Sequence, residues 1–111
     1  MLDMDIEDAI LLLRNNVASI HTVTEWADKV GYSRSHFTTL IRKEYEKTAH
    51  QIMCLVKYKK VLKLIEEDPN QKGWFIARKA GFSDVKSLYK FLKHHFDTSL
   101  TLLRREAKEC K

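Results

Sequence analysis

A chain of 111 residues is long enough for one domain or two very small subdomains, and its apolar fraction of 44% is typical of a folded protein rather than a disordered one. Only three glycines and one proline are present, which leaves few turn residues for hairpins and favours helices. No run approaches the roughly 18 apolar residues of a membrane span, and the first residues are acidic where a secretory signal would be basic, so we expect neither.

The net charge of +5 is unevenly distributed along the chain. Residues 1–30 hold two basic and six acidic residues, whereas residues 31–65 hold eight basic and two acidic ones. After an acidic stretch at 66–70, residues 71–111 hold ten basic and four acidic residues. Two basic segments favour a polyanion as partner, and charge alone leaves both nucleic acid and an anionic membrane surface open.

Apolar residues recur with the 3.6-residue period of helices, and no convincing strand alternation is present. The first helix is predicted with Asp3 and Asp5 as capping acids. Its apolar face consists of Ile6, Ala9, Ile10, Leu13 and Val17. Thr22 and Glu25 have the spacing of a capping box, which predicts a short second helix that ends at Gly31.

Ser33 is placed to cap a third helix. Its inward residues are predicted to be Phe37, Leu40, Ile41 and Tyr45. A second capping box, Thr48 with Gln51, then opens the longest helix, which runs to about Glu66. A helix of this length spans roughly 28 Å at 1.5 Å per residue.

The segment 67–73 contains the only proline and breaks the long helix. A short fifth helix is predicted to end at Gly81, and either Ser83 or Asp84 caps the sixth. Ser99 caps the last helix, which leads into a basic tail.

An octapeptide occurs twice: "WADKVGYS" at residues 26–33 returns as "IARKAGFS" at residues 76–83, with four of eight positions identical. Each copy corresponds to a short helix and a turn with glycine and an aromatic residue, followed by a longer capped helix. Two helices joined by a short turn with glycine form a helix-turn-helix. The sequence therefore predicts an all-α fold with two such units joined by the long helix.

The second helix of each unit carries a polar face opposite its apolar one. In the first unit this face holds Ser35, Thr38, Thr39 and Arg42, and in the second it holds Lys86, Tyr89, Lys90 and Lys93. Every one of these side chains can donate a hydrogen bond and none is acidic, which fits phosphates and base edges. A connector of roughly 28 Å is also of the order of the ~34 Å between successive major grooves on one face of B-DNA.

These features resemble the DNA-binding domain of the bacterial AraC/XylS-type transcriptional regulators, over about residues 5 to 105. The segments that carry the resemblance are "WADKVGYSRSHFTTLIRKEYEKT" and "IARKAGFSDVKSLYKFLKHHFDTSLTLLRRE". Even the register agrees, because Gly31 to Phe37 is six residues and Gly81 to Leu88 is seven, a difference that the family shows.

The resemblance implies one DNA-binding domain over residues 1–111, with seven helices in a homeodomain-like arrangement. Its parts are a first subdomain over about 5–47, a linker helix over about 48–66 and a second subdomain over about 70–109. It further implies a cytoplasmic, sequence-specific regulator of transcription that binds double-stranded DNA with both recognition helices in adjacent major grooves. It implies no enzymatic activity and no cofactor. RNA polymerase is a further partner that it implies, and so is a sensor or dimerisation domain if the chain is a fragment.

By position in the family, ten residues are expected to read bases: Arg34, Ser35, Thr38, Thr39, Arg42, Val85, Lys86, Ser87, Tyr89 and Lys90. Lys93 extends the second set, and His36 is expected either to contact a phosphate or simply to be exposed.

The chain departs from the family pattern at several positions, so a target sequence cannot be borrowed from relatives. Lys57 and Thr39 stand where arginine is usual or frequent, and Asp97 stands for a glycine. Leu100 replaces proline, Leu103 replaces an aromatic residue, and "GWF" at 73–75 is an unusual start to a helix.

Other functions find less support in the sequence. Trp26 is expected in a core, whereas Trp74 could be a stacking platform. No metal ligand set is expected, since His94 and His95 are adjacent and Cys54 has only His50 at suitable spacing. Both cysteines are expected to be reduced, and no catalytic motif is present. The rival function is a helical protein-interaction module with weak or lost DNA reading, which the small Ser35 and Thr39 favour.

Overall fold

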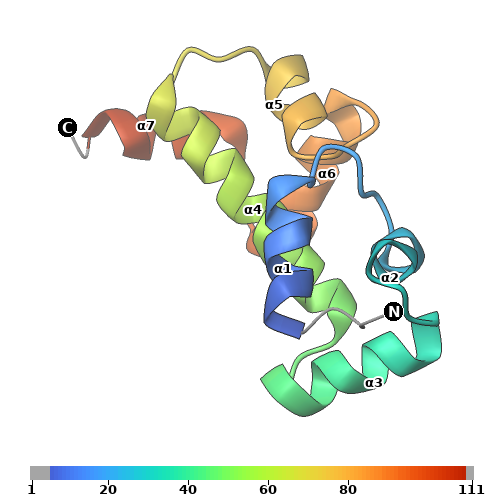
Figure 1. The fold of residues 1–111 in the computed structure, drawn as a ribbon. Helices are drawn as coiled ribbons and strands as arrows, with labels where there is room; N and C mark the ends of the chain where they lie inside the picture. Colours follow the sequence, from blue (N-terminus) through green and yellow to red (C-terminus); the bar gives the residue numbers. More distant parts are fainter. Residues whose placement is uncertain (1–5, 110–111) are drawn as a thin grey trace. The chain divides into compact units, whose positions relative to one another are not determined.

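The computed structural model describes residues 6–109, which form seven α-helices without a strand (Figure 1). The helices are α1 (Ile6–Asn15), α2 (Val23–Val30), α3 (Arg34–Tyr45), α4 (Ala49–Glu67), α5 (Gly73–Lys79), α6 (Val85–Phe96) and α7 (Leu100–Glu109). The predicted all-α fold of seven helices is thereby confirmed. The proposed capping acids Asp3 and Asp5 lie outside the described residues.

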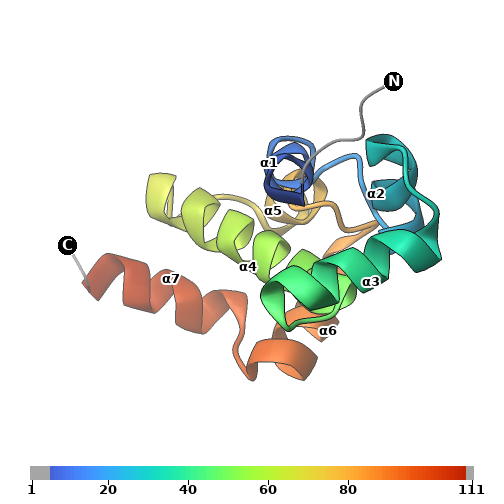
Figure 2. The ribbon, with the colours of Figure 1, turned by 60° about the horizontal axis from the view of Figure 1, so that its bottom comes forward.

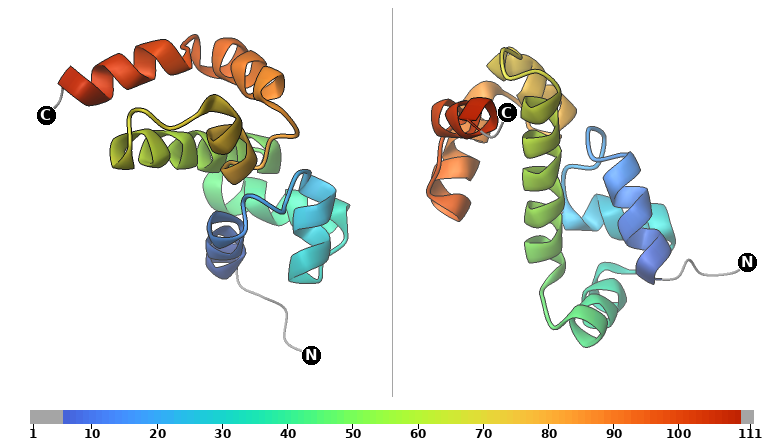
Figure 3. Two further views of the ribbon diagram at one scale, coloured as in Figure 1. Left: turned by 90° about the horizontal axis from the view of Figure 1, so that it is seen from above. Right: turned by 90° about the vertical axis from the view of Figure 1, so that its left-hand side faces the viewer.

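The chain divides into two compact units between Val56 and Lys57, within α4. Figure 3 shows α4 as one uninterrupted helix. Its first part contributes Ala49, Ile52 and Met53 to the core of the first unit, and its second part contributes Val61, Leu64 and Ile65 to the core of the second. The helix thus has two apolar stretches that serve two separate cores.

The first unit is built around Trp26 of α2, which is fully buried. Its indole Nε1–H donates a hydrogen bond of 2.9 Å to the carbonyl oxygen of Ala9. The ring packs edge-on against Phe37 of α3, with 4.7 Å between ring centroids. Burial of the indole with its N–H satisfied confirms the core prediction for Trp26 and ties α1, α2 and α3 together.

The second unit packs α5, α6 and α7 against the remainder of α4. Its core includes Ile76, Leu88 and Leu92, all fully buried. Tyr58 of α4 stacks on Phe96 of α6 with 3.8 Å between ring centroids. Each unit therefore has its own hydrophobic centre.

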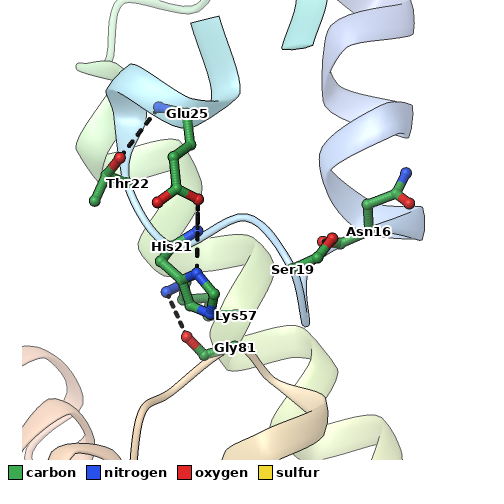
Figure 4. Close-up of polar contacts among 7 residues, drawn as sticks. All are labelled: Asn16, Ser19, His21, Thr22, Glu25, Lys57 and Gly81. Atoms are coloured by element: carbon green, nitrogen blue, oxygen red, sulfur yellow. Dashed lines mark hydrogen bonds and ion pairs between the residues drawn. The ribbon is translucent and has the colours of Figure 1, made fainter. Parts of the chain in front are cut away.

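Local hydrogen bonds start the helices where the sequence predicts them. The Thr22 hydroxyl accepts the Glu25 N–H at 3.1 Å, and the Glu25 carboxylate accepts the N–H of His21 at 3.1 Å, one residue before the usual partner in a capping box (Figure 4). At α4 the box is reciprocal, with Thr48 and Gln51 exchanging bonds of 2.9 and 3.1 Å. The predicted capping box at α4 is thus confirmed, whereas at α2 Thr22 caps the helix and Glu25 bonds the preceding residue instead.

The sixth helix is capped by Asp84, whose carboxylate accepts the Ser87 N–H at 2.7 Å. Ser99 caps α7 by accepting the Leu102 N–H at 3.3 Å. Asp84 is the stronger acceptor of the two alternatives that the sequence left open, because an ionised carboxylate makes a charge-assisted hydrogen bond.

Candidate nucleic-acid interface

The two octapeptides fold into the same turn. Gly31 and Gly81 adopt left-handed backbone conformations with φ of 84° and 86°. The N–H of the aromatic residue after each glycine donates a hydrogen bond to a carbonyl oxygen of the preceding helix. Tyr32 donates to Ala27 at 3.0 Å, and Phe82 donates to Ala77 at 2.8 Å. This is the Schellman arrangement that closes a helix through a left-handed residue, and it explains why glycine is identical in the two copies.

Each turn is followed by a longer helix with one buried and one exposed side. Figure 2 shows α2 and α3 as successive helices that run in different directions, joined by the first turn. In α3, Phe37 and Ile41 are fully buried. The predicted site residues Arg34, Ser35, His36, Thr39 and Arg42 are exposed, and Thr38 is half-buried.

The two threonines of α3 turn their hydroxyl groups back onto their own helix. Thr38 and Thr39 donate hydrogen bonds of 3.1 and 2.9 Å to the carbonyl oxygen of Ser35. Their hydrogens are therefore engaged, which leaves the oxygen lone pairs and the methyl groups for a partner. This pair acts as acceptors and apolar contacts rather than as the donors that the sequence suggested.

A hollow of about 260 Å³ lies beside α3. Its walls combine predicted site residues with the first turn of α4: Val23, Arg34, Thr38, Thr39, Arg42, Thr48, Ala49 and His50. Sequence reasoning missed Thr48 and His50, which the turn between α3 and α4 brings to the hollow. The hollow has two arginines and no carboxylate in its wall, so it suits an anionic group.

The second unit presents α6 in the same way. Leu88 and Leu92 are fully buried, and Val85 and Ser87 are half-buried. The remaining predicted residues Lys86, Tyr89, Lys90 and Lys93 are exposed. A shallow depression of about 730 Å³ is lined by Tyr89, Lys90, Lys93 and His94. The structure thus adds His94 to the residues that the sequence predicts for this surface.

Acids near this second surface are already engaged in local bonds. Hydrogen bonds from the Ser87 N–H and hydroxyl hold the pKa of Asp84 below its ordinary value, and the nearby charges of Lys86 and Lys90 lower it further. Asp97 lies 3.2 Å from the Lys93 ammonium, but both side chains are largely exposed, so the pair is weak and Lys93 is free to exchange partners.

Lys57 binds the second turn directly (Figure 4). Its side chain is buried, and its ammonium donates a hydrogen bond of 3.2 Å to the carbonyl oxygen of Gly81. The same nitrogen lies 5.0 Å from the centre of the Phe82 ring, within range of a cation–π contact. Lys57 therefore joins α4 to the turn that precedes α6 through a compact ammonium group, where arginine would offer a planar fork.

The described part of the chain contains neither a metal site nor a membrane-spanning helix. No group of three His, Cys, Asp or Glu residues between 6 and 109 is arranged to hold a metal ion. The Cys54 sulfur lies 3.8 Å from His50 Nδ1. None of the helices in this part is both long and apolar enough to cross a bilayer.

Comparison with known proteins agrees with this geometry. A family model described as a helix-turn-helix domain matches residues 26–106. A search of curated protein sequences finds no match.

Solved structures share the fold at low sequence identity. A transcriptional regulator with an AraC-type DNA-binding domain from Chromobacterium violaceum superposes with a TM-score of 0.79 at 16% identity, covering 96% of this chain and 94% of its own. The C-terminal domain of the response regulator AraT from Geobacillus stearothermophilus gives 0.79 at 16% identity, with coverage of 90% and 83%. The DNA-binding domain of the global transcriptional factor AdpA, solved with a target DNA, gives 0.78 at 13% identity, with coverage of 95% and 94%.

At these identities the structural matches show the fold, and the family is shown by the model that spans most of the chain. The seven helices of the described residues also match those of solved AraC-type DNA-binding domains. The chain therefore belongs to the AraC-type family of helix-turn-helix DNA-binding domains.

Proposed function

We propose that this chain is a sequence-specific, double-stranded DNA-binding regulator of transcription whose helices α3 and α6 enter adjacent major grooves. The observation that carries the proposal is the pair of exposed, acid-free faces, one after each identical turn. A solvated helix face in a chain with 15 acidic residues would normally include some of them as partners for lysine. A surface that meets phosphates excludes them.

The two faces have different chemistry, which fits two different half-sites. The α3 face offers Arg42 and Arg34 for guanine or phosphate and threonine methyl groups for thymine. The α6 face offers three lysines and the Tyr89 hydroxyl. The structurally similar AdpA domain was solved with a target DNA, which supports duplex DNA as the partner proposed here. A bacterial regulator of this kind works in the cytoplasm, where the chromosome lies.

A protein-interaction module is the second function that an observation favours. Thr38 and Thr39 have both committed their hydroxyl hydrogens to Ser35, which removes two donors from the face of α3. A helix with fewer donors is a poorer reader of bases, and such a unit could instead serve as a protein-docking surface.

Duplex binding across a salt series separates these functions. The preferred duplex is first selected from a random pool, and its affinity is then measured between 50 and 200 mM salt. Each neutralised phosphate contributes a slope of about −0.9 to log K against log salt. We expect a slope of about −4 to −7 for two inserted helices, with much weaker binding to unselected duplex. A slope near zero, or equal affinity for all duplexes, would favour the interaction module.

The length of the selected site tests the use of both helices. Recognition by α3 and α6 in adjacent grooves predicts two conserved blocks whose centres lie about 10 base pairs apart. A single block would show that only one unit reads DNA.

A further inference from the structure

Trp74 is the most exposed large apolar side chain among the described residues, at 59%. In its helix α5, Ile76 and Ala77 lie in the core, whereas Arg78 and Lys79 are exposed. The other tryptophan, Trp26, is fully buried with its N–H satisfied. The chain thus leaves the indole of Trp74 largely in water.

Gly73 fixes the start of α5 against the exposed helix α6. A Cβ atom at Gly73 would lie 3.0 Å from Val85 Cγ2 and 3.2 Å from the Tyr89 hydroxyl oxygen. Only glycine allows this close approach without displacing Val85, a stiff β-branched side chain. The unusual "GWF" start of the helix therefore has a structural reason. Trp74 follows Gly73 directly in the chain, at the end of α5 that approaches Val85 and Tyr89 of α6.

The sequence that follows Trp74, through α5 and α6, is basic. Residues 72–96 contain six basic residues, Lys72, Arg78, Lys79, Lys86, Lys90 and Lys93, and a single acid. That acid, Asp84, is engaged as the cap of α6. An exposed indole among cations suits a partner that combines negative charge with apolar surface. The sugar–phosphate backbone of DNA has both, as deoxyribose alternates with phosphate.

We infer that Trp74 is a further DNA-contacting residue, which packs on the deoxyribose backbone beside the groove that α6 enters. This inference rests on the proposed function and extends it beyond the two recognition helices. In a duplex the bases are stacked on one another, so the indole contacts sugar rather than a base face. The contact positions the second unit on DNA without reading sequence, and it removes no charge from the interface.

Tryptophan emission and affinity test this contact in the full chain. Emission should shift to shorter wavelength when the selected duplex is added, because Trp74 leaves water while Trp26 is already buried. We expect Trp74→Ala to weaken duplex binding about tenfold, because the apolar area of the indole that deoxyribose covers is lost. The salt slope should stay unchanged, since no cation is lost. Trp74→Phe should remain within about threefold of the wild type and abolish the emission shift.

Leu102→Ala is the matched control, because Leu102 is an exposed apolar residue on α7 of the same unit. It should leave the affinity unchanged, and circular dichroism should show that all three variants keep their helices. If Trp74→Ala binds as tightly as the wild type, the sugar contact is overturned while the proposed function stays intact. The same follows if Trp74→Phe loses as much affinity as Trp74→Ala. Emission that responds to phosphatidylserine vesicles but not to duplex would overturn it in favour of a membrane surface. A chain that binds no duplex at all would overturn both proposals.

Discussion

Among residues 6–109, Asp97 is one of two non-glycine residues that hold a left-handed backbone at the end of a helix, with φ of 47°. The other is Glu46, with φ of 56°. For most side chains this conformation costs about 1–2 kcal/mol, and aspartate tolerates it better than most. The position is one where the resemblance leads us to expect glycine, so the chain keeps the turn but accepts strain to make it.

Replacement of Asp97 by glycine should stabilise the protein by about 0.5–1 kcal/mol, because relief of strain exceeds the greater freedom of glycine in the unfolded chain. Urea unfolding followed by circular dichroism measures the change. Asp97→Asn is the control, since it removes the exposed pair with Lys93 but keeps a side chain that tolerates this conformation, and it should change little. Equal effects of the two substitutions would show that the ion pair, not the backbone, matters.

Asp84 makes the stability of the second unit dependent on pH. Its pKa is lowered from 3.8 chiefly by the hydrogen bond from the Ser87 N–H, then by the Ser87 side chain, with the charges of Lys86 and Lys90 adding to the effect. A carboxyl whose pKa is lower in the folded state stabilises that state above the unfolded pKa, and the contribution is lost as pH falls through the folded value.

We therefore expect Asp84→Ala to lower the melting temperature at pH 7 and the gap to wild type to shrink below about pH 4. Thermal unfolding at several pH values between 3 and 7 gives this comparison. Asp84→Asn keeps a capping oxygen without the charge, so it should melt close to wild type at acid pH and somewhat below it at pH 7. A gap for Asp84→Ala that is constant with pH would exclude the charged cap as its cause.

Lys57 offers the clearest residue-scale test of how the second turn is held. Lys57→Met keeps the length of the side chain but leaves the Gly81 carbonyl without this donor. We expect a loss of about 1–3 kcal/mol, the cost of leaving a buried acceptor unsatisfied. Lys57→Arg should largely retain stability, because a guanidinium can reach the same oxygen. Lys59→Met on the exposed side of α4 is the control and should stay within about 0.5 kcal/mol. A small effect of Lys57→Met would mean that the Phe82 contact and the turn itself suffice.

At the scale of elements, the helices and their caps could be predicted because they depend on neighbours in sequence. A capping box needs residues three apart, as at Thr48 and Gln51, and a Schellman turn needs glycine at one position, as at Gly31. The choice between Ser83 and Asp84 could not be made, since both can cap and only the backbone path decides.

The parts of the site that escaped prediction depend on contacts between elements. His50 joins the hollow at α3 because the turn after α3 places the first turn of α4 there. Gly73 is an unusual residue at the start of a helix in the sequence. The structure explains it, because Val85 and Tyr89 of α6 approach the Gly73 backbone closely. The threonine hydroxyls of α3 were predicted as donors, but periodicity cannot show that both hydrogens return to Ser35.

At the scale of the whole molecule, the two units have separate cores and share helix α4. In the proposed function, each unit therefore makes its own contribution to DNA affinity. Each unit has its own hydrophobic centre, so a substitution on the surface of one should not disturb the other. Effects of distant and independent sites add within about 0.5 kcal/mol. Two exposed cations, Arg42 on α3 and Lys90 on α6, allow this independence to be tested.

We expect Arg42→Ala and Lys90→Ala each to weaken binding to the selected duplex by about 1–3 kcal/mol where the side chain reads a base. Each should relax the preference in a different half of the site, and the double variant should lose the sum of the two. Lys43→Ala, one residue along α3, is the control for charge and should weaken binding to all duplexes to a similar, smaller extent. Relaxation of the same half-site by both substitutions would mean that α3 and α6 do not occupy separate grooves.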